Sequence, residues 1–203
     1  MLFNSTIFKF DNLSISDIES GIMDLGKKGA LAYKQKSDSP NSCWGRYVQF
    51  GKRSPQLDAS LRIGHALMEA SFFNELRTKQ QLGYIVHSGL KNYEKVLGML
   101  FLIQSSDYDP YQVDKRVEDW TKQMLQSLDK LDDKEFSTYQ EAVVKMLQEE
   151  DKTIAERHGT LYFDAVVLEG EFGYTKRVEQ AAKDLTKTEV IKVLRSNLDK
   201  YFY

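Results

Sequence analysis

The spacing of hydrophobic and polar positions changes about half-way along this 203-residue chain. The first half alternates short apolar runs with two stretches of helical spacing, whereas the second half repeats apolar residues every three or four positions. A period of two is typical of strands, and a period near 3.6 is typical of amphipathic helices. Strands followed by helices predict an α+β fold, in which helices pack on one face of a mainly antiparallel sheet.

Short runs of the first half have the composition and spacing of strands. These runs are Thr6–Phe10, Ala30–Lys36, Trp44–Phe50, Tyr84–Ser88 and Val96–Ser105. Because Val96–Ser105 is almost entirely apolar, it predicts a central strand that is covered on both faces. A polar turn over Gly89–Lys95 predicts that the last two strands are antiparallel neighbours.

Capping residues and apolar stripes predict the helices. Ser16 and Glu19 fit a capping box that opens a helix ending at Gly26, and Ser54-Pro55 opens a second one. The second helix carries an apolar stripe of Leu57, Leu61, Met68 and Phe72. Apolar positions of helical period predict the remaining helices, which contain Val113, Val117, Trp120, Met124 and Leu128; Phe136, Tyr139, Val143, Met146 and Leu147, preceded by Asp132-Asp133; Ile154–Leu168; Thr175–Lys183; and Thr186–Leu198. No Gly/Ser- or Pro-rich linker interrupts the chain, so residues 1–203 are predicted to form a single domain.

Composition and charge exclude several classes of partner. The formal net charge is −2 and the sequence pI is about 6.0, which give no field that would attract nucleic acid or an anionic membrane. The longest apolar stretch, Val96–Ile103, is far shorter than the roughly 20 residues of a membrane-spanning helix. The first residues lack the pattern of a signal peptide, and the single cysteine, Cys43, is interpreted as a small apolar residue. We therefore expect a cytoplasmic protein.

The residues that could bind a metal ion do not form a recognisable motif. His65, His87 and His158 stand apart, and neither His-Glu-x-x-His nor His-x-x-Glu-His occurs. The patterns of a serine nucleophile elbow and of a phosphate-binding loop are absent from the sequence as well. We expect no metal site in this chain.

One segment combines unusual residues at a junction of two predicted elements. A helix runs into Arg77, a strand leaves from Tyr84, and Gly83 between them predicts a close backbone approach or a positive φ. Two interpretations stay open from these residues. Either Arg77 and Tyr84 are presented to a ligand, or Arg77 caps the helix and Tyr84 is a half-buried strand aromatic. The residue pattern by itself favours the second interpretation.

A longer motif contains this junction. Residues 72–89, FFNELRTKQQLGYIVHSG, resemble a segment in the C-terminal half of the pitrilysin and insulin-degrading enzyme family, whose pattern is F-x-x-L-R-T-x-x-Q-L-G-Y-x-V. The matching residues are Phe73, Leu76, Arg77, Thr78, Gln81, Leu82, Gly83, Tyr84 and Val86. From about residue 14 onward the rest of the chain is similar to the family more loosely.

The resemblance implies a role within a larger enzyme. The chain would be the C-terminal, fourth domain of a zinc metalloendopeptidase that hydrolyses peptides in an enclosed chamber. Zinc would be bound outside this chain, so the implied partners are peptide substrates and the N-terminal catalytic half of the same polypeptide. The chain alone would be inactive. The alternative is a catalytically inactive scaffold or interaction subunit of the same fold. Members of the family occur in the cytosol and in the periplasm, so the resemblance implies the periplasm as the alternative compartment.

The resemblance also implies roles for particular residues. Tyr84 would donate a hydrogen bond to the oxyanion that forms from the scissile carbonyl, and Arg77 would hold the substrate backbone. Phe73, Gly83 and Ile85 would bind substrate, with Phe73 lining the pocket just beyond the scissile bond. Gln80 stands where relatives often carry glutamate, and the implied mechanism does not depend on that charge.

Overall fold

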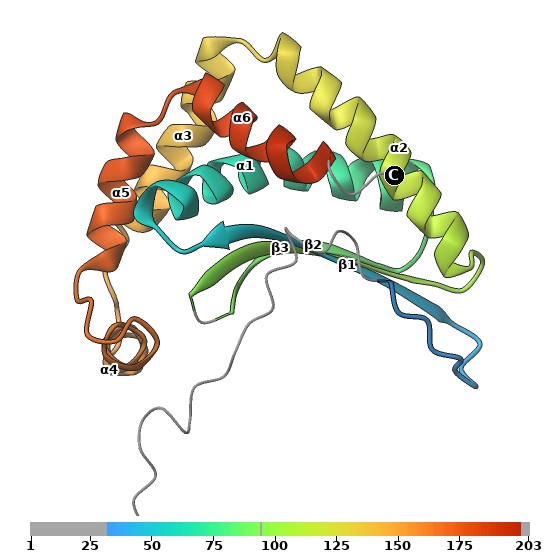
Figure 1. Ribbon diagram of the computed structural model, residues 1–203, viewed down its shortest axis with the longest axis horizontal. Coiled ribbons are helices and arrows are strands. Elements are labelled where there is room, and N and C mark those ends of the chain that lie inside the picture. The colour runs from blue at the N-terminus through green and yellow to red at the C-terminus, as the bar shows by residue number, and fades with distance from the viewer. Residues whose placement is uncertain (1–31, 94, 200–203) are drawn as a thin grey trace, which may run out of the picture.

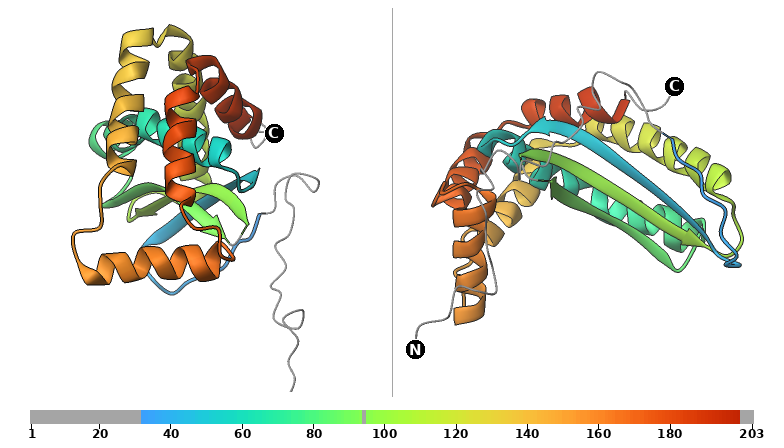
Figure 2. Two further views of the ribbon diagram at one scale, coloured as in Figure 1. Left: turned by 90° about the vertical axis from the view of Figure 1, so that its left-hand side faces the viewer. Right: turned by 60° about the horizontal axis from the view of Figure 1, so that its bottom comes forward.

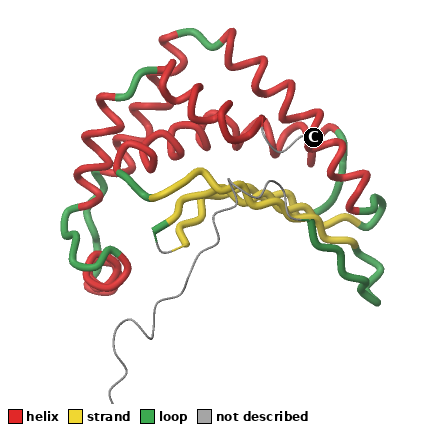
Figure 3. The backbone as a smooth tube through the Cα atoms, viewed as in Figure 1, coloured by secondary structure: helices red, strands yellow, loops and turns green. Residues whose placement is uncertain are grey.

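The computed structural model describes residues 32–93 and 95–199. The described chain consists of a sheet and a layer of helices (Figures 1 and 3). Its elements are β1 (Ser42–Lys52), α1 (Pro55–Phe73), β2 (Ile85–Tyr93), β3 (Val96–Ser105), α2 (Pro110–Ser127), α3 (Asp133–Leu147), α4 (Ile154–Tyr162), α5 (Tyr174–Asp184) and α6 (Lys187–Leu198). The predicted strand Thr6–Phe10 and the predicted helix Ser16–Gly26 lie outside the described residues.

The sheet has three antiparallel strands in the order β1-β3-β2. Its register places the start of β1, the end of β3 and the start of β2 at the same end of the sheet, because Ser42 lies opposite Ser105 and Ile85 lies opposite Gln104. The helices cover one face of this sheet in every view (Figures 1 and 2). The predicted fold class, α+β with helices on one face of an antiparallel sheet, is confirmed.

The central position of β3 is confirmed, but its predicted burial on both faces is wrong for the described residues. Four alternate side chains of β3 are buried beneath the helices, namely Leu97, Met99, Phe101 and Ile103. Leu100 and Leu102 point to the other face and are only partly buried. Part of that face is covered by the sheet's own aromatics, since the Tyr47 ring lies over Gly98 and meets the Tyr93 ring edge-on at 5.3 Å.

Three aromatic rings join the helices to the sheet. Phe72 of α1 lies 5.3 Å from Phe101 of β3 and 4.9 Å from Trp120 of α2, measured between ring centroids. The Trp120 indole N–H also donates to the Ser71 hydroxyl at 3.1 Å, so its polar atom is satisfied inside the core. Burial of these rings fixes α1 and α2 relative to β3.

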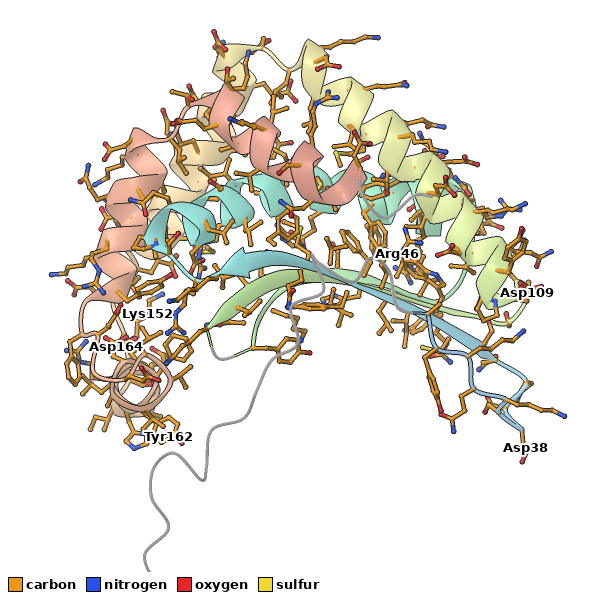
Figure 4. The ribbon with its side chains drawn as sticks, viewed as in Figure 1. Asp38, Arg46, Asp109, Lys152, Tyr162 and Asp164 are labelled. Atoms are coloured by element: carbon orange, nitrogen blue, oxygen red, sulfur yellow. The ribbon has the colours of Figure 1, made fainter. Side chains whose placement is uncertain are left out.

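A polar contact ties β1 to α2 at the same end of the domain. Asp114 accepts hydrogen bonds from the Trp44 indole at 2.8 Å and from the Arg46 guanidinium at 2.6 Å. Arg46 extends from the strand toward α2 in Figure 4. One carboxylate of α2 therefore joins two side chains of the same face of β1.

The helix starts follow the predicted capping residues. The Ser54 hydroxyl accepts from the Leu57 N–H and Pro55 begins α1, while Asp132 and Thr186 cap α3 and α6. The helix predicted over Ile154–Leu168 changes to a π-helical turn at Phe163. No residue of α4 is buried in the described structure. The described helices include none that is long and apolar enough to cross a membrane.

Two predictions at strand ends were wrong. Residues 32–36 of the predicted strand Ala30–Lys36 are exposed and form no strand, because no described strand pairs with them. The predicted turn Gly89–Lys95 is much shorter, since β2 continues to Tyr93 and pairs with β3 along its whole length. Gly89 lies opposite Leu100 within that ladder, so this glycine belongs to a strand.

We expect Phe72→Ala to lower the free energy of unfolding by about 3–5 kcal/mol, because the change empties a fully enclosed aromatic site. Phe172→Ala is the matched control, since Phe172 is 57% exposed and its loss should change stability by less than about 1 kcal/mol. Urea unfolding of both variants measures the difference. Equal losses of stability in both variants would contradict the role of the Phe72 ring in joining the helices to the sheet.

Candidate functional site

The segment after α1 leaves the helix through a wider turn. Residues Asn74–Lys79 form a π-helical turn, and the Gln80 N–H donates to the Glu75 carbonyl at 2.9 Å. The Leu82 N–H donates to the Leu76 carbonyl at 2.9 Å, and both leucine side chains are fully buried. π-Helical turns occur often at functional sites, and this one connects the last turn of α1 to the start of β2.

Gly83 lies directly against the backbone of β3. A Cβ atom on residue 83 would be 1.8 Å from the Gln104 carbonyl oxygen and 2.8 Å from its carbonyl carbon, so only glycine fits. The predicted close approach is confirmed. The positive φ of this turn falls two residues earlier, at Gln81, where φ is 52°.

Phe73, Arg77 and Tyr84 gather at this end of the domain. The Arg77 guanidinium carbon is 4.9 Å from the centroid of the Phe73 ring and 5.3 Å from the centroid of the Tyr84 ring. Phe73 is 39% exposed and Tyr84 is 85% exposed. Neither the Arg77 guanidinium nor the Tyr84 hydroxyl has a hydrogen-bond partner among the described residues. The two aromatic rings thus hold a cation whose N–H groups remain available.

The exposure of Tyr84 excludes one of the two interpretations of that residue. A half-buried strand aromatic is wrong for Tyr84, because the residue precedes β2 and its ring is almost entirely in solvent. Arg77 lies in the last turn of the π-helical segment, where its contacts are with the two rings. Ile85 begins β2 and is 39% exposed. It points to the face of the sheet opposite the helices, since its neighbour Val86 is buried beneath them and successive strand residues alternate between the two faces. The structure therefore groups Phe73, Arg77 and Tyr84, with Ile85 next to them.

A network of polar side chains supports the π-helical turn, and its contact with α2 could not be identified from the sequence. Glu75 accepts from the Lys79 ammonium at 2.9 Å and from the Gln80 amide nitrogen at 3.2 Å. The hydrogen bond from Lys79, and next the one from Gln80, hold the pKa of the Glu75 carboxyl below its usual range. Arg116 of α2 donates to the amide oxygen of Gln80 at 3.2 Å. Arg116 lies 36 positions away from Gln80, so no local pattern connects the two.

The histidines lie in three separate environments. His65 Nε2 is 3.1 Å from the Ser88 hydroxyl and its Nδ1 is 3.9 Å from a Glu69 carboxylate oxygen. His87 is exposed on β2, and His158 stacks on Tyr162. Throughout residues 32–93 and 95–199, no group of three or more histidine, cysteine, aspartate or glutamate side chains is placed to hold a metal ion. These residues therefore do not fit a zinc site. Cys43, interpreted from the sequence as a small apolar residue, is exposed on β1.

Known proteins match most of the chain. Residues 63–162 match a family model described as "PQQ synthase PqqF-like, C-terminal lobe domain 4". A nardilysin-like protein of Arabidopsis thaliana is 30% identical over 161 residues, covering 78% of this chain and 16% of the relative. The insulin-degrading enzyme of Homo sapiens is 26% identical over 177 residues, covering 87% of this chain and 17% of the enzyme. The chain belongs to the pitrilysin and insulin-degrading enzyme family.

Solved structures of this pitrilysin and insulin-degrading enzyme family have the same fold. The crystal structure of pitrilysin matches with a TM-score of 0.72 and 23% identity, covering 80% of this chain and 17% of that one. The periplasmic protease PqqL from Escherichia coli matches with a TM-score of 0.60 and 16% identity, covering 82% of this chain and 19% of that one. The chain thus corresponds to a domain of the C-terminal lobe and spans less than a fifth of the length of these family members.

We expect Gly83→Ala to destabilise the domain and to displace the start of β2, because the added methyl group would overlap the Gln104 carbonyl. The cost should exceed about 2 kcal/mol, since the obstacle is backbone and not a flexible side chain. Gly159→Ala is the control, because a Cβ on residue 159 meets nothing within 4 Å. Urea unfolding gives the stability change. Equal stability of the two variants would show that the approach of Gly83 to β3 is not required.

Proposed function

We propose that this domain contributes half of the active site of a zinc metalloendopeptidase and supplies groups that bind substrate and stabilise the oxyanion. The observation that carries the proposal is the pair of unused donors. Arg77 and Tyr84 lie together at the end of the sheet where β2 begins. Both have donor groups without hydrogen-bond partners among the described residues. Donors held in place before a reaction are what a developing negative charge requires.

Tyr84 is the candidate oxyanion donor. Its position is fixed through the backbone, because Gly83 lies against β3 on one side and Ile85 enters the β2 ladder on the other. Its ring is fixed by the guanidinium above it. A phenol held in this way can donate to a carbonyl oxygen as that oxygen gains charge, and the fixed position reduces the reorganisation needed in the transition state.

Arg77 is the candidate binder of the substrate backbone. A guanidinium is planar, stacks through its faces and donates through its edge. The rings of Phe73 and Tyr84 contact the guanidinium, while its N–H groups remain free to bind peptide carbonyl oxygens. Phe73 adds partly exposed apolar surface beside that edge and could pack against a substrate side chain. Ile85, at the open face of β2, extends the same surface.

The remaining catalytic groups would come from the rest of the polypeptide. The described residues do not fit a zinc site. We therefore propose that the zinc ligands and the general base lie in the N-terminal half of the parent protein. Peptides are the proposed substrates. The names of two relatives support this class, since one is an insulin-degrading enzyme and another is the A-factor-processing enzyme of Saccharomyces cerevisiae.

In the full-length parent, we expect Tyr84→Phe to lower kcat for peptide hydrolysis by about a hundredfold, because one oxyanion donor is lost. The KM and the bound zinc should change little, since the variant keeps the ring on which Arg77 stacks.

Tyr93→Phe provides the matched control, because Tyr93 is a half-exposed tyrosine at the opposite end of the same strand. Steady-state kinetics and metal analysis are made on both variants and on the parent. Turnover that is equal in the Tyr84→Phe variant and the parent would remove Tyr84 from the mechanism.

A further inference from the structure

Among the described residues, one side-chain hydrogen bond joins α2 to the turn that presents Arg77 and Tyr84. Gln80 follows the π-helical turn directly, and its amide group has two polar neighbours. Its nitrogen donates to a Glu75 carboxylate oxygen at 3.2 Å, and its oxygen accepts from Arg116 at 3.2 Å. The amide thus connects a carboxylate of the turn with a guanidinium of a different helix.

An uncharged amide is suited to this position. Glutamine has both a donor and an acceptor in one group, so it can face a carboxylate and a guanidinium at the same time. A glutamate at position 80 could still accept from Arg116, but it would place a second carboxylate against Glu75. The glutamine at position 80 therefore matches the presence of Glu75.

Arg116 is itself held in place. Its guanidinium carbon lies 4.5 Å from the centroid of the Tyr108 ring, in the segment that connects β3 to α2. The Tyr108 N–H donates to the Ser105 hydroxyl at 3.0 Å, and Ser105 is the last residue of β3. The contact of Arg116 with Gln80 therefore links the turn to both β3 and α2.

The turn needs such support because its backbone is unfavourable. Gln81 has a φ of 52°, a left-handed conformation that costs a residue with a Cβ about 1 kcal/mol or more. Buried Leu82 and the close contact of Gly83 hold the turn on one side of Gln81. On the other side, Gln80 provides the contact that reaches another helix.

We propose that Arg116 is a positioning residue, which acts through Gln80 to hold the turn that presents Arg77 and Tyr84. The catalytic consequence of this positioning rests on the proposed function. The mechanical consequence does not, because it concerns only contacts within the domain. The two are therefore tested separately.

The first test is amide hydrogen exchange of this chain. We expect Arg116→Met to raise the exchange rates of the Gln80 and Leu82 N–H groups by about fivefold or more, as loss of one net hydrogen bond allows, while the unfolding midpoint moves little. Lys115→Met is the matched control. Among the described residues, the exposed neighbour Lys115 interacts with Tyr111, Glu118 and Asp119 of its own helix, so its loss should leave these rates unchanged. Unchanged rates in the Arg116→Met chain would overturn the proposal.

The second test exchanges the two side chains of the bridge. We expect Gln80→Glu alone to raise the same exchange rates at pH 7, because the two carboxylates repel each other at that contact. Adding Glu75→Gln to this variant should restore the slow rates, since the amide and the carboxylate have only changed places. Rates that remain high in the double variant would contradict the bridge.

The third test is kinetic and uses the full-length parent. We expect Arg116→Met to lower kcat and also to raise KM, because the turn presents both Tyr84 and Arg77, and Arg116→Lys to recover part of both effects. The kcat losses of Arg116→Met and Tyr84→Phe should be less than additive, because both act on the same donor. Fully additive losses would contradict positioning. If Tyr84→Phe alone leaves turnover unchanged, the proposed function fails, whereas the exchange results still decide the role of Arg116.

Discussion

The contact between residue 83 and the carbonyl of Gln104 constrains the whole candidate site. A Cβ at position 83 would lie 1.8 Å from that carbonyl oxygen, so the chain can pass the end of β3 only as glycine. This passage allows Ile85 to enter the ladder opposite Gln104 and leaves Tyr84 outside it. The same passage places Leu82 in the core and requires the left-handed turn at Gln81. An almost fully exposed tyrosine thus occupies a position that the backbone determines.

Side chains then give this backbone its chemical character. Arg77 contacts the rings of Phe73 and Tyr84, which orders a long side chain without using its hydrogen-bond donors. Glu75, Gln80 and Arg116 hold the turn beneath, with the neutral amide between opposite charges. Donors left unused at the edge of a domain are expected where the acceptor belongs to another molecule or another part of the polypeptide.

The sequence predicted the architecture well, because capping residues and apolar periods are local signals. Ser54-Pro55 and the apolar run of β3 identified a helix start and the central strand correctly. The length of β2 and the missing strand over residues 32–36 depended on pairing, which local patterns do not encode. Composition alone favoured structural roles for Arg77 and Tyr84, and the motif was needed to select them. The sequence did not identify Arg116, because its contact with Gln80 joins residues 36 positions apart. Neither the helical nor the strand periodicity of the sequence reports such a contact.

In the proposed mechanism, Tyr84 donates to the oxyanion and not to the ground-state peptide. The most direct measurement is the affinity of the full-length parent and its Tyr84→Phe variant for a substrate-like peptide in which a phosphinate replaces the scissile amide. We expect the variant to bind this transition-state analogue about a hundredfold more weakly, while its affinity for the unmodified peptide hardly changes. Equal affinity of both proteins for the phosphinate peptide would contradict the proposed mechanism.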